Sequence, residues 1–323
     1  MQIEWNSDSL GQIKKLFVFD KDTDKVIIYM EDWLPRVGHN FDYVIETIRQ
    51  NPQIHFELIP DCPVQITNKP DNLNIEWNAS NNQGYFWKAY LQCKQLDPVA
   101  NKDIQHTVCT FNGGYTLKRN AMCLLLFYHN LWNAKYCYKI FVASQTSLQL
   151  VEKIKNKINP LGASKVKKFL RSTNNLETTS IKNYADRVKI QKKIIDATFI
   201  NLIVGPTDEN NVVSPYVDEK LILPIINKSI WLMFDTVGWY KNLTKFYGFK
   251  TFDTIFDYSF DSVNDSQDRA MHIADQLCVL DKLSRHDQQK LYMDSKHIID
   301  YNYDHLVSGK WIQHGQKAWA NLN

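Results

Sequence analysis

The stretch from Ser214 to Asp235 constrains the fold more than any other part of this 323-residue chain. Glu219 and Lys220 open an apolar run that contains a proline, and a second apolar run follows at residues 230–234. This pattern predicts a short helix that leads into a buried strand. A carboxylate and an ammonium group at a helix start suit a nucleotide, because they can bind ribose hydroxyls and a phosphate. The alternative is a solvated Glu–Lys pair that caps an ordinary helix.

The first part of the chain also alternates between strand and helix patterns. Residues 16–19 and 26–29 are short apolar runs rich in β-branched and aromatic residues, and we expect both to be strands. Residues 40–50 have apolar side chains at helical spacing, and residues 54–59 form another strand pattern that ends at a proline. The β–α–β order predicts an α/β fold, with residues 1–103 as one small domain.

A glycine turn between a predicted strand and a predicted helix is a second candidate for phosphate binding. Residues 105–111 read as a strand, and residues 120–129 read as a strongly apolar helix. Between them lie Asn112, two glycines, Lys118 and Arg119. This layout presents backbone N–H groups and cations to a phosphate. Neither a GxGxxG nor a Walker pattern is present, so the turn is not a standard dinucleotide or ATP loop.

Several of these segments resemble known glycosyltransferases. The segment Tyr216-Val-Asp-Glu-Lys-Leu221 resembles Tyr-Val-Thr-Glu-Lys-Leu of the α1,3-fucosyltransferases, in which the Glu and the Lys bind the nucleotide of the donor sugar. Residues 239–252 and 256–261 look like a group of phage-encoded glycosyltransferase-like proteins. The similarity covers about half of the chain, from near residue 107 to near residue 277. It implies a GT-B-like fold, in which two Rossmann-like lobes face a cleft.

The resemblance also implies where a nucleotide sugar would bind. The donor lobe would be residues 104–290, and Arg119 matches an arginine that contacts the nucleotide diphosphate in the fucosyltransferases. The phage-type relatives carry further arginines before this one, which this chain lacks, and they often have glycine where this chain has Asp235. The layout and the resemblance together assign the nucleotide-sugar site to Asn112, Lys118, Arg119, Tyr216, Glu219 and Lys220.

Sugar transfer also needs a base that deprotonates the acceptor hydroxyl. In open α/β sheets, ligands bind beyond the carboxyl ends of the strands. Glu31 and Asp32 directly follow a predicted strand, so either is a candidate base, although an exposed acid pair in a loop fits the same residues. Lys220 and Arg119 would neutralise the leaving diphosphate, so neither a metal ion nor a further cofactor is expected.

Charge is unevenly distributed and leaves the acceptor open. Residues 1–103 hold 10 Lys and Arg against 15 Asp and Glu, whereas residues 104–200 hold 16 against 4. Much of the excess lies in two predicted basic helices, residues 147–158 and 164–171. The acceptor could be a glycan or a hydroxymethylated base in phage DNA. A nucleic-acid-binding protein without catalysis and a degenerate transferase kept as an interaction module are the alternatives to an enzyme.

The remaining features concern location and the end of the chain. No apolar run reaches the ~18 residues of a membrane helix, the N-terminus does not resemble a signal peptide, and the six cysteines form no CxxC pair. We therefore expect a cytoplasmic protein, in the host cytoplasm if phage-encoded, that does not bind a membrane. Residues 291–323 read as a helical tail that could cross back to the first lobe. Asp257 and Asp261 lie in a predicted loop, where they either bind a metal or, more commonly, tether the loop.

Overall fold

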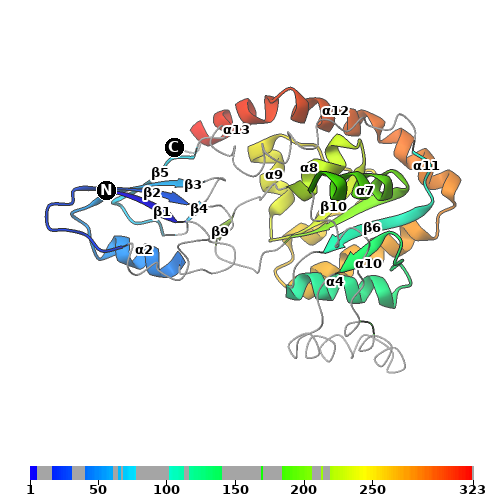
Figure 1. The fold of residues 1–323 in the computed structure, drawn as a ribbon, viewed down its shortest axis with the longest axis horizontal. Coiled ribbons are helices and arrows are strands. Elements are labelled where there is room, and N and C mark those ends of the chain that lie inside the picture. Colours follow the sequence, from blue (N-terminus) through cyan, green and yellow to red (C-terminus); the bar gives the residue numbers. More distant parts are fainter. Residues whose placement is uncertain are drawn as a thin grey trace.

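The computed structural model has an α/β fold with two separate parallel sheets (Figure 1). It describes residues 1–5, 17–30, 41–60, 65–66, 68–77, 102–112, 116–139, 169, 184–205, 212–213 and 219–321. Of the two predicted basic helices, only Phe169 lies within these ranges. Within the described part of the chain, no helix is both long and apolar enough to cross a membrane.

The first sheet is formed by strands from the first 75 residues. Its order is β1 (Gln2–Trp5), β2 (Lys25–Met30), β3 (His55–Pro60) and β5 (Leu73–Ile75), all parallel. Buried and more exposed residues alternate along each strand, so only one face carries the core. The apolar side of helix α2 (Phe41–Arg49) packs against that face.

The predicted strand at residues 16–19 is wrong where the structure describes it. Residues 17–19 have no strand pairing, and the first strand is β1. The reason is that β2 already pairs with β1 along one edge and with β3 along the other. Phe17 and Phe19 instead contribute rings to the first core, where Phe19 lies edge-on to Phe56.

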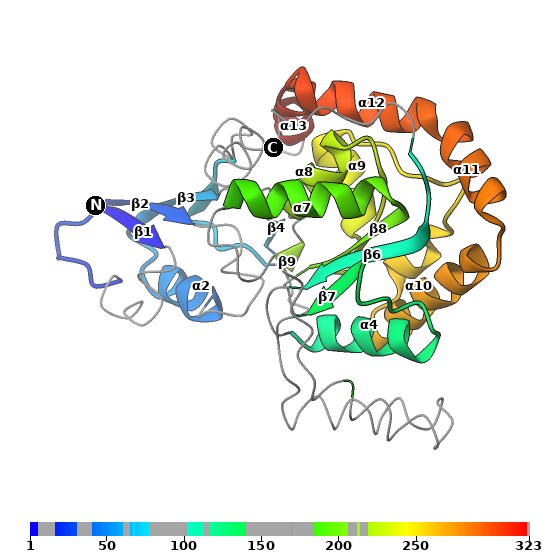
Figure 2. The same cartoon turned by 45° about the vertical axis from the view of Figure 1, so that its right-hand side comes forward.

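The second sheet is buried on both faces. It consists of β6 (His106–Asn112), β7 (Cys137–Lys139), β8 (Thr198–Val204) and β10 (Ile230–Phe234), in the order β10-β8-β6-β7. Every residue of β8 and β10 is buried, as expected for a parallel sheet between two helical layers. Helices α4 (Leu117–Tyr128) and α10 (Ser266–Asp281) cover one face, and α7 (Tyr184–Asp196) and α8 (Glu219–Ile226) cover the other (Figures 1 and 2).

The strand order of the second sheet reverses between β6 and β8. From β6 the chain passes through α4 to β7 on one side, and from β8 it passes through α8 to β10 on the other. In open α/β sheets such a switch point opens a crevice beyond the carboxyl ends of the two strands, and ligands bind there. The first sheet follows chain order in its described strands, so the described residues form no switch point there.

One short strand pair and the helices at the end of the chain join the two sheets. Strands β4 (Gln65–Ile66) and β9 (Val212–Val213) form an antiparallel pair between the two halves. We call each sheet with the helices packed on it a lobe. Helices α11 (Arg285–Asp294), α12 (Lys296–Val307) and α13 (Lys310–Ala320) run across the second lobe back to the first sheet (Figure 1). Helix α13 packs on α9 (Trp239–Tyr247), and Trp319 contacts both hydrophobic cores.

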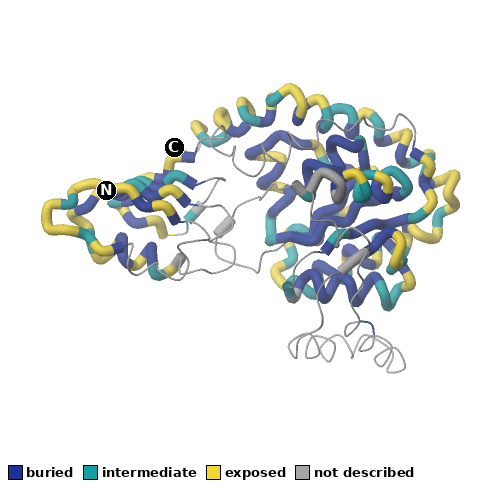
Figure 3. Tube along the Cα trace, in the orientation of Figure 1, coloured by how far each residue is buried: buried dark blue, intermediate teal, exposed yellow. Residues whose placement is uncertain are grey.

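Burial follows this division of the molecule. The tube view in Figure 3 shows long buried stretches in the second lobe, whereas the first lobe mixes buried and exposed positions along each strand. The strands of the second lobe can therefore bury charged side chains at their ends, which exposed strands cannot do to the same degree.

Candidate functional site

The site begins at the first turn of α4, directly beyond the carboxyl end of β6. Thr116 is the N-cap, and its side chain accepts a hydrogen bond of 3.1 Å from the backbone N–H of Arg119. Lys118 and Arg119 therefore lie in the first helical turn, where the backbone N–H groups favour an anion. The predicted strand, glycine turn and helix are present as β6 and α4, although nothing is described at residues 113–115.

Arg119 reaches from α4 to the neighbouring strand. Its Nε donates to the backbone oxygen of Val204, the last residue of β8, at 3.2 Å. The residue is only 6% exposed, so its guanidinium lies within the edge of the sheet. Arg119 thus connects the first turn of α4 to the end of β8 at the switch point.

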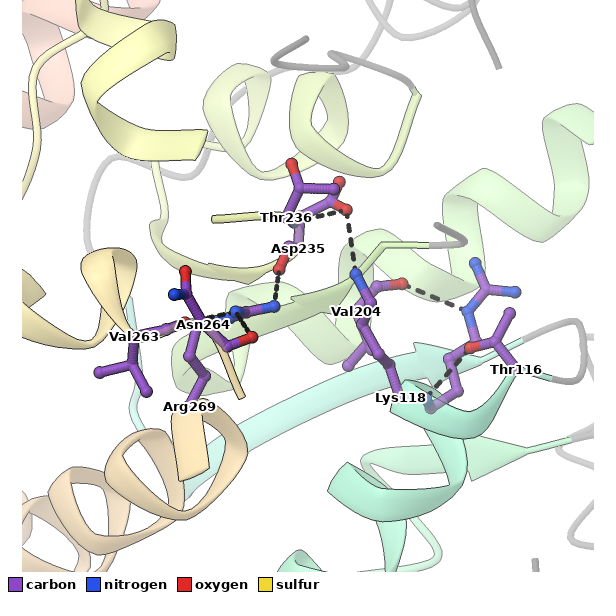
Figure 4. A network of polar contacts seen from close by, with 9 residues as sticks. Thr116, Lys118, Val204, Asp235, Thr236, Val263, Asn264 and Arg269 are labelled. Atoms are coloured by element: carbon purple, nitrogen blue, oxygen red, sulfur yellow. Dashed lines mark hydrogen bonds and ion pairs between the residues drawn. The ribbon is translucent and has the colours of Figure 1, made fainter. Parts of the chain in front are cut away.

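Lys118 forms a buried ion pair with Asp235, the residue after β10. The Lys118 Nζ lies 3.6 Å from Oδ1 of Asp235, and the two side chains are 3% and 0% exposed. The same Oδ1 accepts a hydrogen bond of 2.9 Å from the backbone N–H of Thr236. Figure 4 shows these groups converging on the carboxyl ends of the strands.

Gly205 makes room for the Asp235 carboxylate. Gly205 follows β8, and its N–H donates to the backbone oxygen of Phe234 at 2.9 Å. A Cβ at residue 205 would lie 2.4 Å from Cγ of Asp235 and 2.5 Å from Oδ2. Any side chain at residue 205 would therefore displace the carboxylate, so the glycine is required for close approach rather than for its backbone angles.

A third cation enters the site from α10. Arg269 is 1% exposed, and its guanidinium donates to the backbone oxygens of Asp235 at 3.2 Å and Asn264 at 3.0 Å. The Lys118 ammonium and the Arg269 guanidinium lie 5.8 and 5.9 Å from the centroid of the Phe234 ring. We call Lys118, Arg119, Asp235 and Arg269 the switch-point cluster. It contains three buried cations and one buried carboxylate.

Asp261 is a further carboxylate within electrostatic range of Arg269. Its Oδ2 accepts hydrogen bonds from the N–H groups of Tyr240 at 3.1 Å and Lys241 at 3.3 Å, in the first turn of α9. Burial raises the pKa of Asp261, and these backbone hydrogen bonds oppose the shift. Together with Asp261, the switch-point cluster contains three cations and two carboxylates among the described residues.

The second predicted binding segment begins at the same edge of the sheet. Helix α8 starts at Glu219 and leads into β10, which runs parallel to β8, so the start of α8 lies toward the carboxyl ends of these two strands. Lys220 is half-buried. The topology therefore brings the starts of α4 and α8, which are far apart in sequence, to one switch point.

The other predicted site residues differ in what the structure describes. Asn112 is fully buried at the end of β6, where its Nδ2 donates to Thr110 Oγ1 and Cys123 Sγ inside the lobe. Tyr216, and the candidate bases Glu31 and Asp32, lie outside the described residues.

Three residues of the site were not among the predicted binding residues. Gly205 and Asp235 each follow a continuously apolar run, and that position was the available signal. Arg269 lies on a helix that follows β10 by more than thirty residues, and nothing in its local sequence points to the site.

Asp257 and Asp261 each accept a hydrogen bond at the start of a helix. Asp257 accepts from the backbone N–H of Ser259, and Asp261 accepts from the backbone N–H of Tyr240.

Comparison with known proteins identifies neither a family nor an activity. No family model matches the chain, and no curated protein sequence matches it. The N-terminal domain of trehalose-6-phosphate phosphatase from Candida albicans is a structural neighbour with a TM-score of 0.32 and 10% sequence identity. The match covers 94% of this chain and 72% of that chain, and at this similarity it says nothing about activity.

Proposed function

We propose that the protein is a glycosyltransferase that moves a sugar from a nucleotide-sugar donor to an acceptor hydroxyl. The observation that carries the proposal is the switch-point cluster, in which Lys118, Arg119 and Arg269 are buried with the carboxylate of Asp235. These cations lie beside the N-terminus of α4 at the carboxyl ends of the strands, where an anionic ligand is favoured. A nucleoside diphosphate supplies such an anion. The sequence resemblance to fucosyltransferases points to Arg119 of this cluster, and also to Glu219 and Lys220 at the start of α8.

In this proposal each part of the edge has a role. Arg119 and Lys118, with the first turn of α4, stabilise the negative charge that develops on the leaving diphosphate. Glu219 and Lys220 at the start of α8 bind the ribose and a phosphate. The first lobe holds the acceptor in a GT-B-like arrangement, and Glu31 or Asp32 acts as the base. The chemistry requires no metal ion, because the cations of the chain can neutralise the diphosphate.

One observation favours a second candidate, a non-catalytic binding protein built on the same fold. Lys118 already has a carboxylate 3.6 Å away, so a diphosphate that uses Lys118 has to compete with Asp235. A protein that no longer turns over a donor could retain this ion pair as a structural link. Binding without turnover is therefore the outcome that distinguishes the two candidates.

The test is a thermal-shift screen with nucleotide sugars, followed by a donor-hydrolysis assay. A nucleotide present at 100 times its Kd stabilises the folded state by about 2.7 kcal/mol, so the correct donor raises the melting temperature. We expect one class of nucleotide sugar to do so, and Glu219→Ala and Lys220→Ala each to abolish the shift. Slow release of free sugar from that donor supports the enzyme. A shift without any turnover supports the binding protein, and no shift with any nucleotide contradicts both.

A further inference from the structure

A cavity lies at the edge of the first sheet, and none of the switch-point residues lines it. It has a volume of ≈ 420 Å³ and lies between β5 and α13. Two indoles, Trp77 and Trp319, line it together with the carboxylate of Glu76 and the amides of Asn74 and Gln316. Its volume falls within the range of about 300–1,000 Å³ that is common for small-molecule sites.

The two indoles form the apolar part of this pocket. Their centroids are 5.7 Å apart in an edge-to-face arrangement. Trp77 is only 3% exposed and also packs edge-on against Phe246 and Tyr247, so its position is fixed by the second core. Trp319 is half-buried and offers indole surface to a ligand. An apolar ring face can pack against such a surface.

The polar part consists of exposed side chains at the end of an outer strand. Asn74, Glu76 and Gln316 are exposed residues, so water reaches this side of the pocket. In the described sheet, β5 pairs with β3 alone, and the N–H of Glu76 donates to the backbone oxygen of Leu58 on that side. Neighbouring peptide groups of a strand point to opposite edges, so the outer edge adds backbone donors and acceptors.

Glu76 also belongs to a pair of carboxylates. Glu57 lies beside it on β3 and forms an ion pair of 2.7 Å with Lys25. The hydrogen bond to Glu57 and the charge of that carboxylate raise the pKa of Glu76. Glu76 is thus held beside a second carboxylate and offers oxygen acceptors at the pocket.

We propose that this pocket binds a sugar ring, with a C–H face of the ring against Trp319 and ring hydroxyls on Glu76, Asn74 and Gln316. Hydroxyl groups both donate and accept hydrogen bonds, which matches a mixed set of carboxylate and amide partners. A nucleic acid fits less well, because its phosphates would face Glu76 in a lobe that has more acidic than basic residues. A peptide added as a strand fits less well because β5 is only three residues long.

The inference deepens the proposed function and, as an acceptor subsite, rests on it. The pocket is built where the last helix meets the first sheet, so a ligand would contact both lobes through Trp77 and Trp319. Binding of the sugar itself requires no donor, however. It can therefore be tested when the switch-point cluster is empty or altered.

The experiment probes the full-length protein on an array of printed oligosaccharides without any nucleotide. The best-retained oligosaccharide is then titrated while tryptophan fluorescence is recorded. We expect saturable binding by the wild type, and a loss of affinity of about tenfold or more in Glu76→Gln and in Gln316→Ala. Gln313→Ala is the matched control, because Gln313 is an exposed glutamine one turn earlier on α13 that does not line the pocket.

Three outcomes would overturn the inference. The first is that no oligosaccharide on the array is retained by the wild type. The second is that all three variants bind as the wild type does, which places the sugar elsewhere. The third is that a DNA duplex, titrated in parallel, binds and is lost in Glu76→Gln and Gln316→Ala, which would make the pocket part of a nucleic-acid site. If the protein binds the oligosaccharide as expected but binds no nucleotide, the proposed donor site is wrong and the sugar pocket is still supported.

Discussion

The two sheets are both parallel, yet they treat charge in opposite ways. In the first sheet, one face is open, and the ion pair between Lys25 and Glu57 has side chains 51% and 14% exposed. In the second sheet both faces are covered, and the pair between Lys118 and Asp235 is 3% and 0% exposed. Water screens the first pair, whereas the second lies where its charges interact strongly with each other and with a ligand.

Topology explains why the buried charges gather where they do. The first sheet follows chain order in its described strands, whereas the second reverses between β6 and β8. At that reversal, the helices after β6 and β8 leave on opposite faces and their N-termini remain at one edge. Two parallel sheets therefore differ, through strand order and burial, in where they can hold buried charges.

The largest effect should come from removing the buried carboxylate. Asp235→Ala leaves the Lys118 ammonium buried without its acidic partner, and we expect a loss of about 3–5 kcal/mol in the free energy of unfolding. Replacing Lys118 with Met in the same chain should restore most of it. Urea unfolding followed by tryptophan fluorescence measures both. Glu57→Ala, which breaks the exposed pair, is the control and should cost far less. Equal losses of unfolding free energy from Asp235→Ala and Glu57→Ala would show that the buried and the exposed ion pair do not differ.

A second difference concerns the pH dependence of buried and exposed lysines. Burial lowers the pKa of Lys102 to about 8, and its Nζ donates to Ile195 O and Ser229 Oγ, both at 2.8 Å. Above pH 8 the unfolded chain keeps this proton longer than the folded chain does, so the Lys102 contribution to stability rises with pH. Relative to Lys102→Met, the wild type should gain roughly 2 kcal/mol between pH 7 and pH 10.

The reference variant is needed because buried thiols titrate in the same range. Burial raises the pKa of Cys109 to about 11 and of Cys137 to about 12, so the unfolded thiols ionise first and stability falls with pH. Both variants share this term, and it cancels in their difference. In the first lobe, Glu57 raises the pKa of Lys25, so wild type against Lys25→Met should show no gain in that range. A similar gain in stability with rising pH at both Lys102 and Lys25 would contradict the lowered pKa assigned to Lys102 alone.

A smaller effect should appear at the junction of the two lobes. Trp319 contacts both cores, and Trp319→Ala should lower the free energy of unfolding by about 1–2 kcal/mol, with the small first core affected more than the large second core. Hydrogen exchange followed by mass spectrometry should show faster exchange in β2 and β3 and unchanged exchange in β8. An equal increase of the exchange rate in all three strands would indicate that the two lobes unfold as one unit.

Much of the second lobe could be predicted from sequence because its strands and helices are strongly patterned. The continuous apolar run at residues 230–234 gave β10, and the glycine turn gave the approach to α4, although this helix begins at Leu117 rather than at residue 120 and so includes Lys118 and Arg119. The strand error at residues 16–19 arose because a short aromatic run fits a strand and a loop that packs on a core equally well.

The switch-point cluster could be predicted only in part. Lys118 and Arg119 follow a turn that local pattern reveals, and strand order then places them. Asp235 and Arg269 join the cluster through contacts over more than thirty residues, and no local spacing encodes such contacts.

The most direct test of the central claim is calorimetric titration of the wild type and two arginine variants with GDP and with UDP. Arg119→Lys keeps the charge at the switch point but loses the planar, multidentate guanidinium. Arg49→Lys makes the same change at an exposed residue of the first lobe. The account predicts that the wild type binds at least one nucleotide, that Arg119→Lys weakens it by about tenfold to a hundredfold, and that Arg49→Lys leaves it unchanged. No binding by the wild type, or equal affinities for all three proteins, would contradict a diphosphate site at the switch point.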